Sequence, residues 1–198
     1  TDEPEINDVF TKVNKRIKTQ EIENNKNFSK LSDNEKEVLR KEWVDSIVST
    51  IETSCHELRY LIDDTKIAVN ARNELEKMSF LQIRALHVAL ILRKNIFITG
   101  DAGTGKTRVL KFIIAYYSII HRVNIEITAS TGKAALELKS SGKTGRTIHS
   151  VFKFGKNISP NKIKWKLRDK GYCDWLRKVR AIIIDECSMV NDDLLDSI

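Results

Sequence analysis

Helix breakers and cysteines are scarce in this sequence. The 198-residue chain has two prolines, Pro4 and Pro160, and none of its eight glycines precedes Gly100. Its N-terminal half therefore contains almost nothing that interrupts helices. The three cysteines, Cys55, Cys173 and Cys187, are odd in number, far apart and without metal-ligand spacing. This pattern excludes a disulfide framework and a cysteine zinc site, and it predicts reduced thiols.

Long apolar runs are also absent. No stretch approaches the roughly 18 to 20 apolar residues that a membrane span requires. The first residues, Thr1 to Pro4, lack the basic and then apolar plan of a secretory signal. With 41% apolar and 31% charged residues, the chain can bury one modest core. We therefore expect an intracellular globular protein with no membrane segment.

Positive charge is unevenly distributed. Residues 1–80 contain 13 Lys or Arg against 17 Asp or Glu, whereas residues 81–198 contain 21 against 10. Within the second part, residues 143–180 hold 12 basic side chains and only two acids, Asp169 and Asp174. Such an excess attracts a polyphosphate backbone, but it is equally typical of a solvated surface, so charge alone leaves both interpretations open.

The first 78 residues read as a helical lead-in. Residues 1–30 are polar and weakly periodic, but Ser32 and Glu35 have the spacing of a capping box, and apolar residues then recur every three or four positions from Leu39 to Ile62. This predicts an amphipathic helix, followed by a second over residues 65–77. Its apolar stripe must pack on something, most economically the following domain and otherwise another subunit.

From Ser79 the pattern changes to alternating helices and short apolar strands, which indicates an α/β fold with a mainly parallel sheet. We expect a basic, irregular stretch that includes Trp165 and Trp175, and we expect Ile182–Ile184 to form a central strand because all three residues are apolar. The predicted elements are helix 80–92, strand 95–99, helix 106–119, strand 123–128, helix 133–139, strand 181–184 and a last helix from about residue 191.

Residues 100–107, GDAGTGKT, match the P-loop pattern G-x-x-x-x-G-K-[ST] in full, between a predicted strand and a predicted helix. Glycines let the backbone curl so that its N–H groups and the helix N-terminus point at phosphate oxygens. Lys106 then reaches the β- and γ-phosphates, and the Thr107 hydroxyl binds Mg²⁺. The motif predicts a site for ATP and Mg²⁺.

A second motif, which consists of two acidic residues, lies at the end of the predicted apolar strand 182–184. Asp185 and Glu186 follow that strand, at the sheet edge where open α/β sheets bind ligands. Alone, such acids are more often loop starts or helix caps. Downstream of a P-loop, Asp185 is a candidate for holding Mg²⁺ through water, and Glu186 is a candidate base for the attacking water.

Four ordered motifs resemble one family. They are FITG leading into the P-loop, TASTGKAA at 128–135, TIHS at 147–150 and IDECSMV at 184–190. Together they resemble the Pif-one and RecD-type DNA helicases of superfamily one, over residues 79–198. The resemblance implies a P-loop NTPase (RecA-like) fold: a parallel sheet with helices on both faces, here incomplete and preceded by the helical segment 1–78. Cys187 departs from the Ile or Gln of the closest members.

The resemblance implies an ATP-driven motor that moves 5′ to 3′ on single-stranded DNA and unwinds forked or structured duplexes, with uses in DNA repair, recombination and telomere maintenance. Lys106 and Glu186 are the implied catalytic residues, and Thr107 and Asp185 the magnesium ligands. Gln82 matches the glutamine that contacts adenine, although Ser79 and Gln82 also have capping-box spacing. The implied nucleotide-binding residues are Gln82, Gly100, Ala102, Gly103, Thr104, Gly105, Lys106, Thr107 and Arg108.

On the DNA side, Ser130, Thr131 and Lys133 match the motif that grips the phosphate backbone, where hydroxyls, amides and a lysine suit phosphate oxygens. The alternative is an ordinary helix cap followed by a surface lysine. His149 matches the TIHS motif, and the nearby Phe152 offers a face for bases, although both residue types are more often found in cores. Trp175 and its basic neighbours either extend the DNA track or dock a loop onto the sheet.

The sequence stops 12 residues after Glu186. We therefore expect the N-terminal part of a longer helicase, whose second RecA-like domain would complete the ATP site, and we expect this part alone to turn over ATP weakly or not at all. The resemblance leaves nuclear, mitochondrial, cytoplasmic and viral or phage settings open. Two other classes are alternatives: a P-loop kinase, for which the sequence shows no sign of a lid or acceptor pocket, and a non-motor module that binds nucleotide, DNA or a partner.

Overall fold

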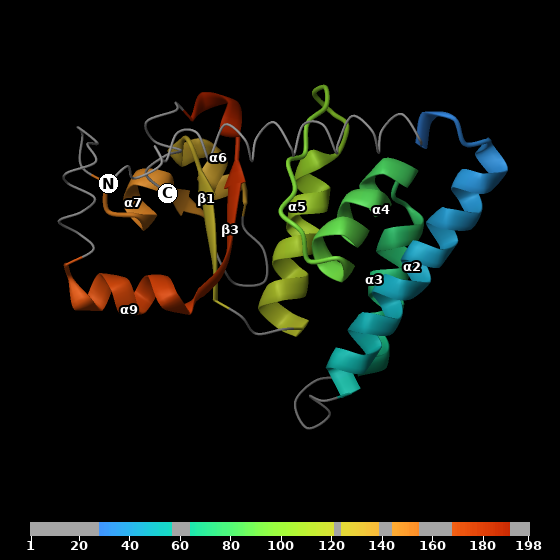
Figure 1. Cartoon of the computed structure of the whole chain (residues 1–198), viewed down its shortest axis with the longest axis horizontal. Coiled ribbons are helices and arrows are strands. Elements are labelled where there is room, and N and C mark those ends of the chain that lie inside the picture. Colours follow the sequence, from blue (N-terminus) through green and yellow to red (C-terminus); the bar gives the residue numbers. More distant parts are fainter. Residues whose placement is uncertain (1–27, 57–63, 121–123, 139–143, 155–167, 191–198) are drawn as a thin grey trace, which may run out of the picture.

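The computed structural model describes residues 28–56, 64–120, 124–138, 144–154 and 168–190. In it, a three-stranded parallel sheet stands between two groups of helices (Figure 1). The fold class expected from the sequence, a parallel α/β fold with helices on both sides of the sheet, is confirmed. None of the helices within these ranges has the length and apolarity needed to span a bilayer.

The helical part comprises α2 (Asp33–His56), α3 (Asp64–Glu76), α4 (Phe80–Leu86) and α5 (Lys106–Ala115). Two π-helical turns, η1 (His87–Ile91) and η2 (Tyr116–Ile120), extend α4 and α5. The predicted capping box is present, because the Ser32 amide donates to Glu35 Oε2 at 2.8 Å. All four predicted helices are confirmed. The part of the first one predicted beyond residue 56 lies outside the described residues.

The sheet contains β1 (Asn124–Ala129), β2 (Arg146–Thr147) and β3 (Val179–Asp185), in the order β2, β1, β3, with all pairs parallel. Thr128 pairs with Ile184, and its buried hydroxyl donates to the Ile183 carbonyl at 2.8 Å. β1 is therefore the central strand. The prediction that the apolar run Ile182–Ile184 is central was wrong for the described sheet, in which β3 pairs with β1 alone.

The predicted strand over residues 95–99 was also wrong, because these residues form no strand. Ile96 and Ile98 pack against the core, whereas Phe97 between them is 64% exposed, so the expected alternation of side chains is present. A strand also requires a neighbouring backbone to share its hydrogen bonds, and alternation does not supply one. Within the described ranges, residues 95–99 belong to no ladder of the sheet.

Three further helices lie in the second half: α6 (Gly132–Glu137), α7 (Ile148–Val151) and α9 (Lys170–Lys178). A 3₁₀ turn, η3 (Cys187–Met189), follows β3. The prediction of an irregular stretch before β3 was wrong for α9, which Asp169 caps by accepting a hydrogen bond from the Tyr172 amide at 3.1 Å. Trp165, the expected last helix from residue 191 and residues 1–27 lie outside the described residues.

Two clusters of buried side chains hold the sheet in place. The larger joins α2, α3, α4 and α5 to one side of the sheet, with Ile47, Leu86, Ile114 and Ile125 among its members. The smaller contains Ile148, Val151 and Phe152, and Trp175 and Leu176 of α9 pack against it. The apolar stripe of the N-terminal helices is therefore buried on the residues that follow, as the sequence suggested.

Candidate nucleotide site and DNA-facing surface

The P-loop has the backbone conformation that its glycines permit. Gly103 and Gly105 have φ angles of 79° and 81°, in the left-handed region that glycine adopts without strain, and α5 begins directly afterwards at Lys106. The Lys106 ammonium donates to the carbonyls of Gly100 and Asp101, both at 2.8 Å. Residues 101–104 and Thr107 are exposed. This geometry fits a nucleotide: an open loop, a helix N-terminus and a lysine that bridges the loop.

Gln82 caps the start of α4 and also contacts the P-loop. Its side-chain oxygen accepts from the Ser79 amide at 2.9 Å, and its own backbone amide donates to Ser79 Oγ, so the capping box is formed. Its side-chain nitrogen donates to the Thr104 carbonyl at 2.9 Å. Gln82 therefore lies against the P-loop, and a Cβ placed on Gly105 would collide with its side-chain nitrogen.

Asp185 and Glu186 lie where β3 ends, at the same end of the molecule as the P-loop (Figure 1). One Asp185 oxygen accepts from the Glu186 amide at 2.9 Å. Glu186 has a φ of 53°, unusual for a residue with a side chain, and its side chain is exposed. Among the described residues, no three acidic, His or Cys side chains gather as a metal site. An ion held mainly by nucleotide phosphates and one or two protein groups does not require such a cluster.

Arg108 points away from the P-loop toward α3. Its guanidinium donates to Glu74 Oε2 at 2.8 Å and to the carbonyls of Glu74 and Lys77 at 3.3 and 3.2 Å. The hydrogen bond from Arg108 lowers the pKa of the Glu74 carboxyl. This contact could not be predicted from the sequence, because a charge pattern does not identify the partner of an arginine 34 residues away.

The two hydroxyls predicted to grip DNA are engaged or covered. The Thr131 hydroxyl caps α6 by accepting from the Ala134 amide at 3.3 Å. The Ser130 hydroxyl is buried and has no hydrogen-bond partner among the described residues. The capping alternative therefore holds for Thr131, and both residues can offer a phosphate their backbone amides rather than a free hydroxyl.

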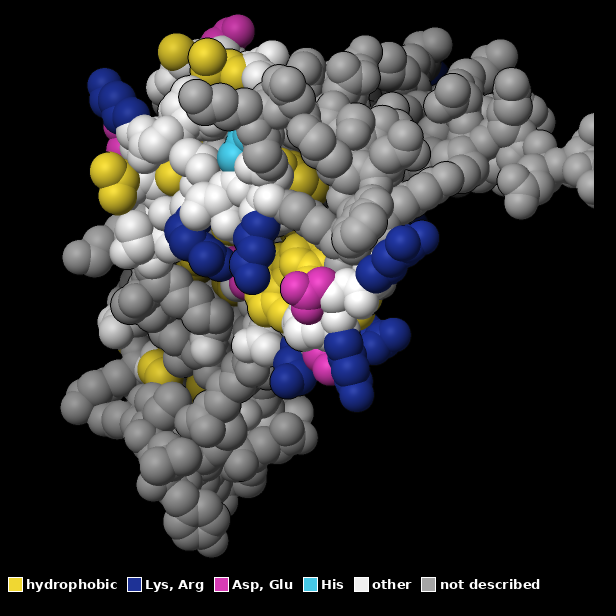
Figure 2. All heavy atoms as spheres, turned by 90° about the vertical axis from the view of Figure 1, so that its left-hand side faces the viewer, with side chains coloured by type: hydrophobic (Ala, Val, Ile, Leu, Met, Phe, Trp, Pro, Cys, Tyr) yellow, Lys and Arg dark blue, Asp and Glu magenta, His cyan; other side chains and the backbone are white. Residues whose placement is uncertain are grey.

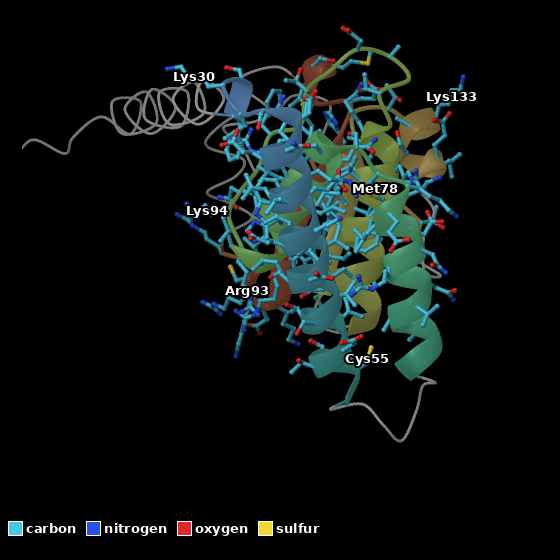
Figure 3. The ribbon with its side chains drawn as sticks, turned by 90° about the vertical axis from the view of Figure 1, so that its right-hand side faces the viewer. Lys30, Cys55, Met78, Arg93, Lys94 and Lys133 are labelled. Atoms are coloured by element: carbon cyan, nitrogen blue, oxygen red, sulfur yellow. The ribbon has the colours of Figure 1, made fainter. Side chains whose placement is uncertain are left out.

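Lys133 and His149 are exposed, and Figure 3 shows Lys133 projecting away from the molecule. Phe152, by contrast, is 1% exposed and belongs to the smaller core cluster. Its side chain packs in the core and is not presented to bases, so of the two interpretations of Phe152 only the structural one fits this conformation. The His149 ring meets Phe154 edge-on, with centroids 6.5 Å apart.

Basic side chains gather on the face formed by the second half of the chain (Figure 2). The exposed Lys and Arg residues from residue 124 onward, within the described ranges, are Lys133, Arg146, Lys153, Arg168, Lys170, Arg177, Lys178 and Arg180. Trp175 is not part of this exposed set, since its indole N–H donates to Glu126 Oε1 at 3.2 Å and its ring packs on Phe152. Trp175 thus docks helix α9 onto the sheet, where the sequence pattern predicts a loop.

Comparison with known proteins identifies the family. The family model described as PIF1-like helicase matches residues 77–198. The chain belongs to the PIF1-like helicase family. The match covers every P-loop residue, both acids and the TASTGK and TIHS motifs, whereas α2 and α3 lie entirely outside it.

Among the curated relatives are an ATP-dependent DNA helicase PIF5 of Trypanosoma brucei brucei, 38% identical over 128 residues, and an ATP-dependent DNA helicase RRM3 of Saccharomyces cerevisiae, 36% identical over 120 residues. These alignments cover 63% and 59% of this chain but only 13% and 16% of the relatives. A Pif1 helicase of the bacterium Psychrobacter is 38% identical over 100 residues, which is 50% of this chain and 14% of that protein. No solved structure matches the chain significantly.

Proposed function

We propose that this chain is the ATP-binding part of the first RecA-like domain of an ATP-dependent DNA helicase. The observation that supports this most directly is the open P-loop, bridged by Lys106, at the same end of the molecule as Asp185 and Glu186 in a member of the PIF1-like helicase family. The proposal extends to the whole protein: translocation 5′ to 3′ on single-stranded DNA, unwinding of forked or structured duplexes, an intracellular setting and a second RecA-like domain that completes the site.

In this proposal, Lys106 exchanges its loop carbonyls for the β- and γ-phosphate oxygens, and the amides of residues 102–108 bind the phosphates. Thr107 and Asp185 would hold Mg²⁺, which offsets the negative charge of the phosphates when bound. Glu186 would accept a proton from the attacking water. Gln82 would meet adenine while remaining bonded to Thr104. These roles agree with the exposure of Thr107 and Glu186.

DNA would contact the basic face through Lys133 and His149, with the backbone around Ser130 and Thr131 meeting phosphates. Among these residues, Lys133 is the one most strongly expected to contact a DNA phosphate. It is exposed at the N-terminal turn of α6, where a helix also favours anions. Phe152 is not included, because it is buried.

The first test is a titration of the chain with a fluorescent ATP analogue and Mg²⁺. Lys106→Ala should weaken binding about a hundredfold, because it removes a charged donor from the phosphates. Lys111→Ala, which changes an exposed lysine on the same helix, should leave binding unchanged. Equal binding by the wild type and Lys106→Ala would contradict a functional P-loop.

The second part of the test adds single-stranded DNA. Lys133→Ala should weaken DNA binding about threefold to tenfold, because one phosphate contact is lost. It should also reduce the slope of the logarithm of the binding constant against the logarithm of the salt concentration by about one. Nucleotide binding that survives without any DNA binding would instead favour a nucleotide-binding module that is not a motor. Directionality requires the full-length protein on a duplex with a 5′ single-stranded tail.

A further inference from the structure

The C-terminal end of α3 is capped by an arginine from another helix. Arg40 of α2 donates from its Nη2 to the carbonyls of Leu75, Glu76 and Met78, at 3.4, 2.6 and 3.1 Å, and from its Nε to Met78 at 3.2 Å. The Arg40 side chain is only 16% exposed. The last carbonyls of a helix lack partners within the helix, and α3 has no basic residue in its own last turn.

A second arginine completes this cap from the other side. Arg108 of α5 donates to the two remaining carbonyls of the same stretch, those of Glu74 and Lys77, and also to the Glu74 carboxylate. All five consecutive carbonyls from residue 74 to residue 78 therefore accept guanidinium N–H groups from α2 or α5. We call this set, Arg40, Arg108 and residues 74–78, the α3 clamp.

The clamp is connected to the P-loop at two points. Arg108 directly follows Thr107, so its side chain fixes the first turn of α5 on α3. Four residues beyond the clamp, Gln82 holds the Thr104 carbonyl at 2.9 Å. Both ends of the stretch 104–108 are thus bonded to residues 74–82. Met78, which Figure 3 labels, is 3% exposed and anchors this stretch in the larger core.

We propose that the α3 clamp positions the P-loop for nucleotide, so that α2 and α3 are a working part of the site. The proposal rests on the nucleotide-binding function proposed above. Arg40 and Arg108 are positioning residues: they act by holding the loop in its binding conformation. The Arg108–Glu74 ion pair is exposed and adds little stability by itself. Its contribution comes from preorganisation, because a loop that is already ordered loses less entropy when it binds.

The chain offers a matched control. Arg72 of α3 pairs with Asp45 of α2 at 2.9 Å, and this exposed ion pair joins the same two helices away from the clamp. We would compare Arg40→Ala, Arg40→Lys, Arg108→Ala and Arg72→Ala. Each variant would be titrated with the fluorescent ATP analogue and Mg²⁺, and hydrogen exchange at the amides of residues 104–108 would be measured without nucleotide. Thermal unfolding would show which variants remain folded.

The expected result is a threefold to tenfold loss of analogue affinity and a similar increase in amide exchange for both Arg40 and Arg108 variants, with no change for Arg72→Ala. Arg40→Lys keeps the positive charge but lacks the several N–H donors of the planar guanidinium. It replaces Arg40→Ala in the comparison if Arg40→Ala fails to fold. Loss of affinity in Arg108→Ala but not in either Arg40 variant would overturn the clamp and make Arg108 a direct ligand. Unchanged exchange in the Arg40 and Arg108 variants would overturn it even if the wild type bound no nucleotide, which separates this failure from that of the P-loop itself.

Discussion

The two sides of the sheet are covered in different ways. Toward α2, α3, α4 and α5 lies an extensive apolar core that includes Ile47, Leu86 and Ile114, each fully buried. On the other side the smaller cluster of the described residues contains Ile148, Val151 and Phe152, and the cover includes polar links such as the hydrogen bond from Trp175 to Glu126. Hydrophobic burial thus fixes the P-loop helix, whereas the side with the basic surface depends more on hydrogen bonds.

This difference is consistent with separate tasks for the two sides under the proposed function. A P-loop needs a stable platform, because small displacements of its backbone change every phosphate contact. A surface that binds the charged backbone of a nucleic acid, whatever its sequence, needs exposed cations and little burial. The helices outside the family match, α2 and α3, contribute to the P-loop side through the larger core and the α3 clamp.

The largest expected effect tests the comparison directly. Ile114→Ala and Ile148→Ala make the same change at two fully buried positions, one on each side of the sheet. Both should lower the free energy of unfolding within about 2–5 kcal/mol, with Ile114→Ala near the upper end, because its denser surroundings leave a larger cavity. Urea unfolding monitored by circular dichroism measures the difference. A greater loss for Ile148→Ala would reverse our ranking of the two sides.

A smaller effect should come from the polar link of the second side. Trp175→Phe removes the indole N–H that donates to Glu126, whose side chain is only 16% exposed and also accepts from Arg146. We expect a coupling of about 0.5–1.5 kcal/mol between Trp175→Phe and Glu126→Gln in a double-mutant cycle. Strictly additive effects would show that α9 is held by packing alone.

The smallest expected effect concerns pH on the helical side. His87 stacks on Trp43 with ring centroids 5.4 Å apart, and burial lowers its pKa. The folded state therefore favours the neutral ring, while the unfolded chain takes up a proton below about pH 6.5. The stability contribution is full above that pH and is lost as the pH falls. The midpoint of thermal unfolding should drop less between about pH 7.5 and pH 5.5 in His87→Phe than in the wild type. An identical drop in both would exclude His87 as its source.

Local signals in the sequence predicted local structure well. The capping box at Ser32, the helix that starts at Lys106 and the glycine loop before it each depend on residues close together in the chain, and all three are present. The apolar residues of β1 predicted a strand for the same reason. The site residues of the P-loop were therefore identified correctly as a structural unit, although their roles with nucleotide remain proposals.

Features that depend on distant partners were not predicted. Residues 95–99 alternate correctly but lack a paired neighbour, and the central position of β1 depends on which strands lie beside it. Helix α9 was missed because its basic residues obscured an amphipathic pattern, although Asp169 gave a capping signal. The α3 clamp joins residues up to 38 positions apart, and nothing in the spacing of arginines indicates which carbonyls they will meet.

The backbone at Glu186 shows a local compromise between folding and chemistry. A glycine would adopt its φ of 53° without strain, whereas a residue with a side chain loses about 1 kcal/mol there. The turn after β3 is therefore less stable than the same turn with glycine would be, and what it gains is a carboxylate next to Asp185. A stabilising redesign of this domain that followed backbone preference alone would choose glycine here and thereby remove the proposed base.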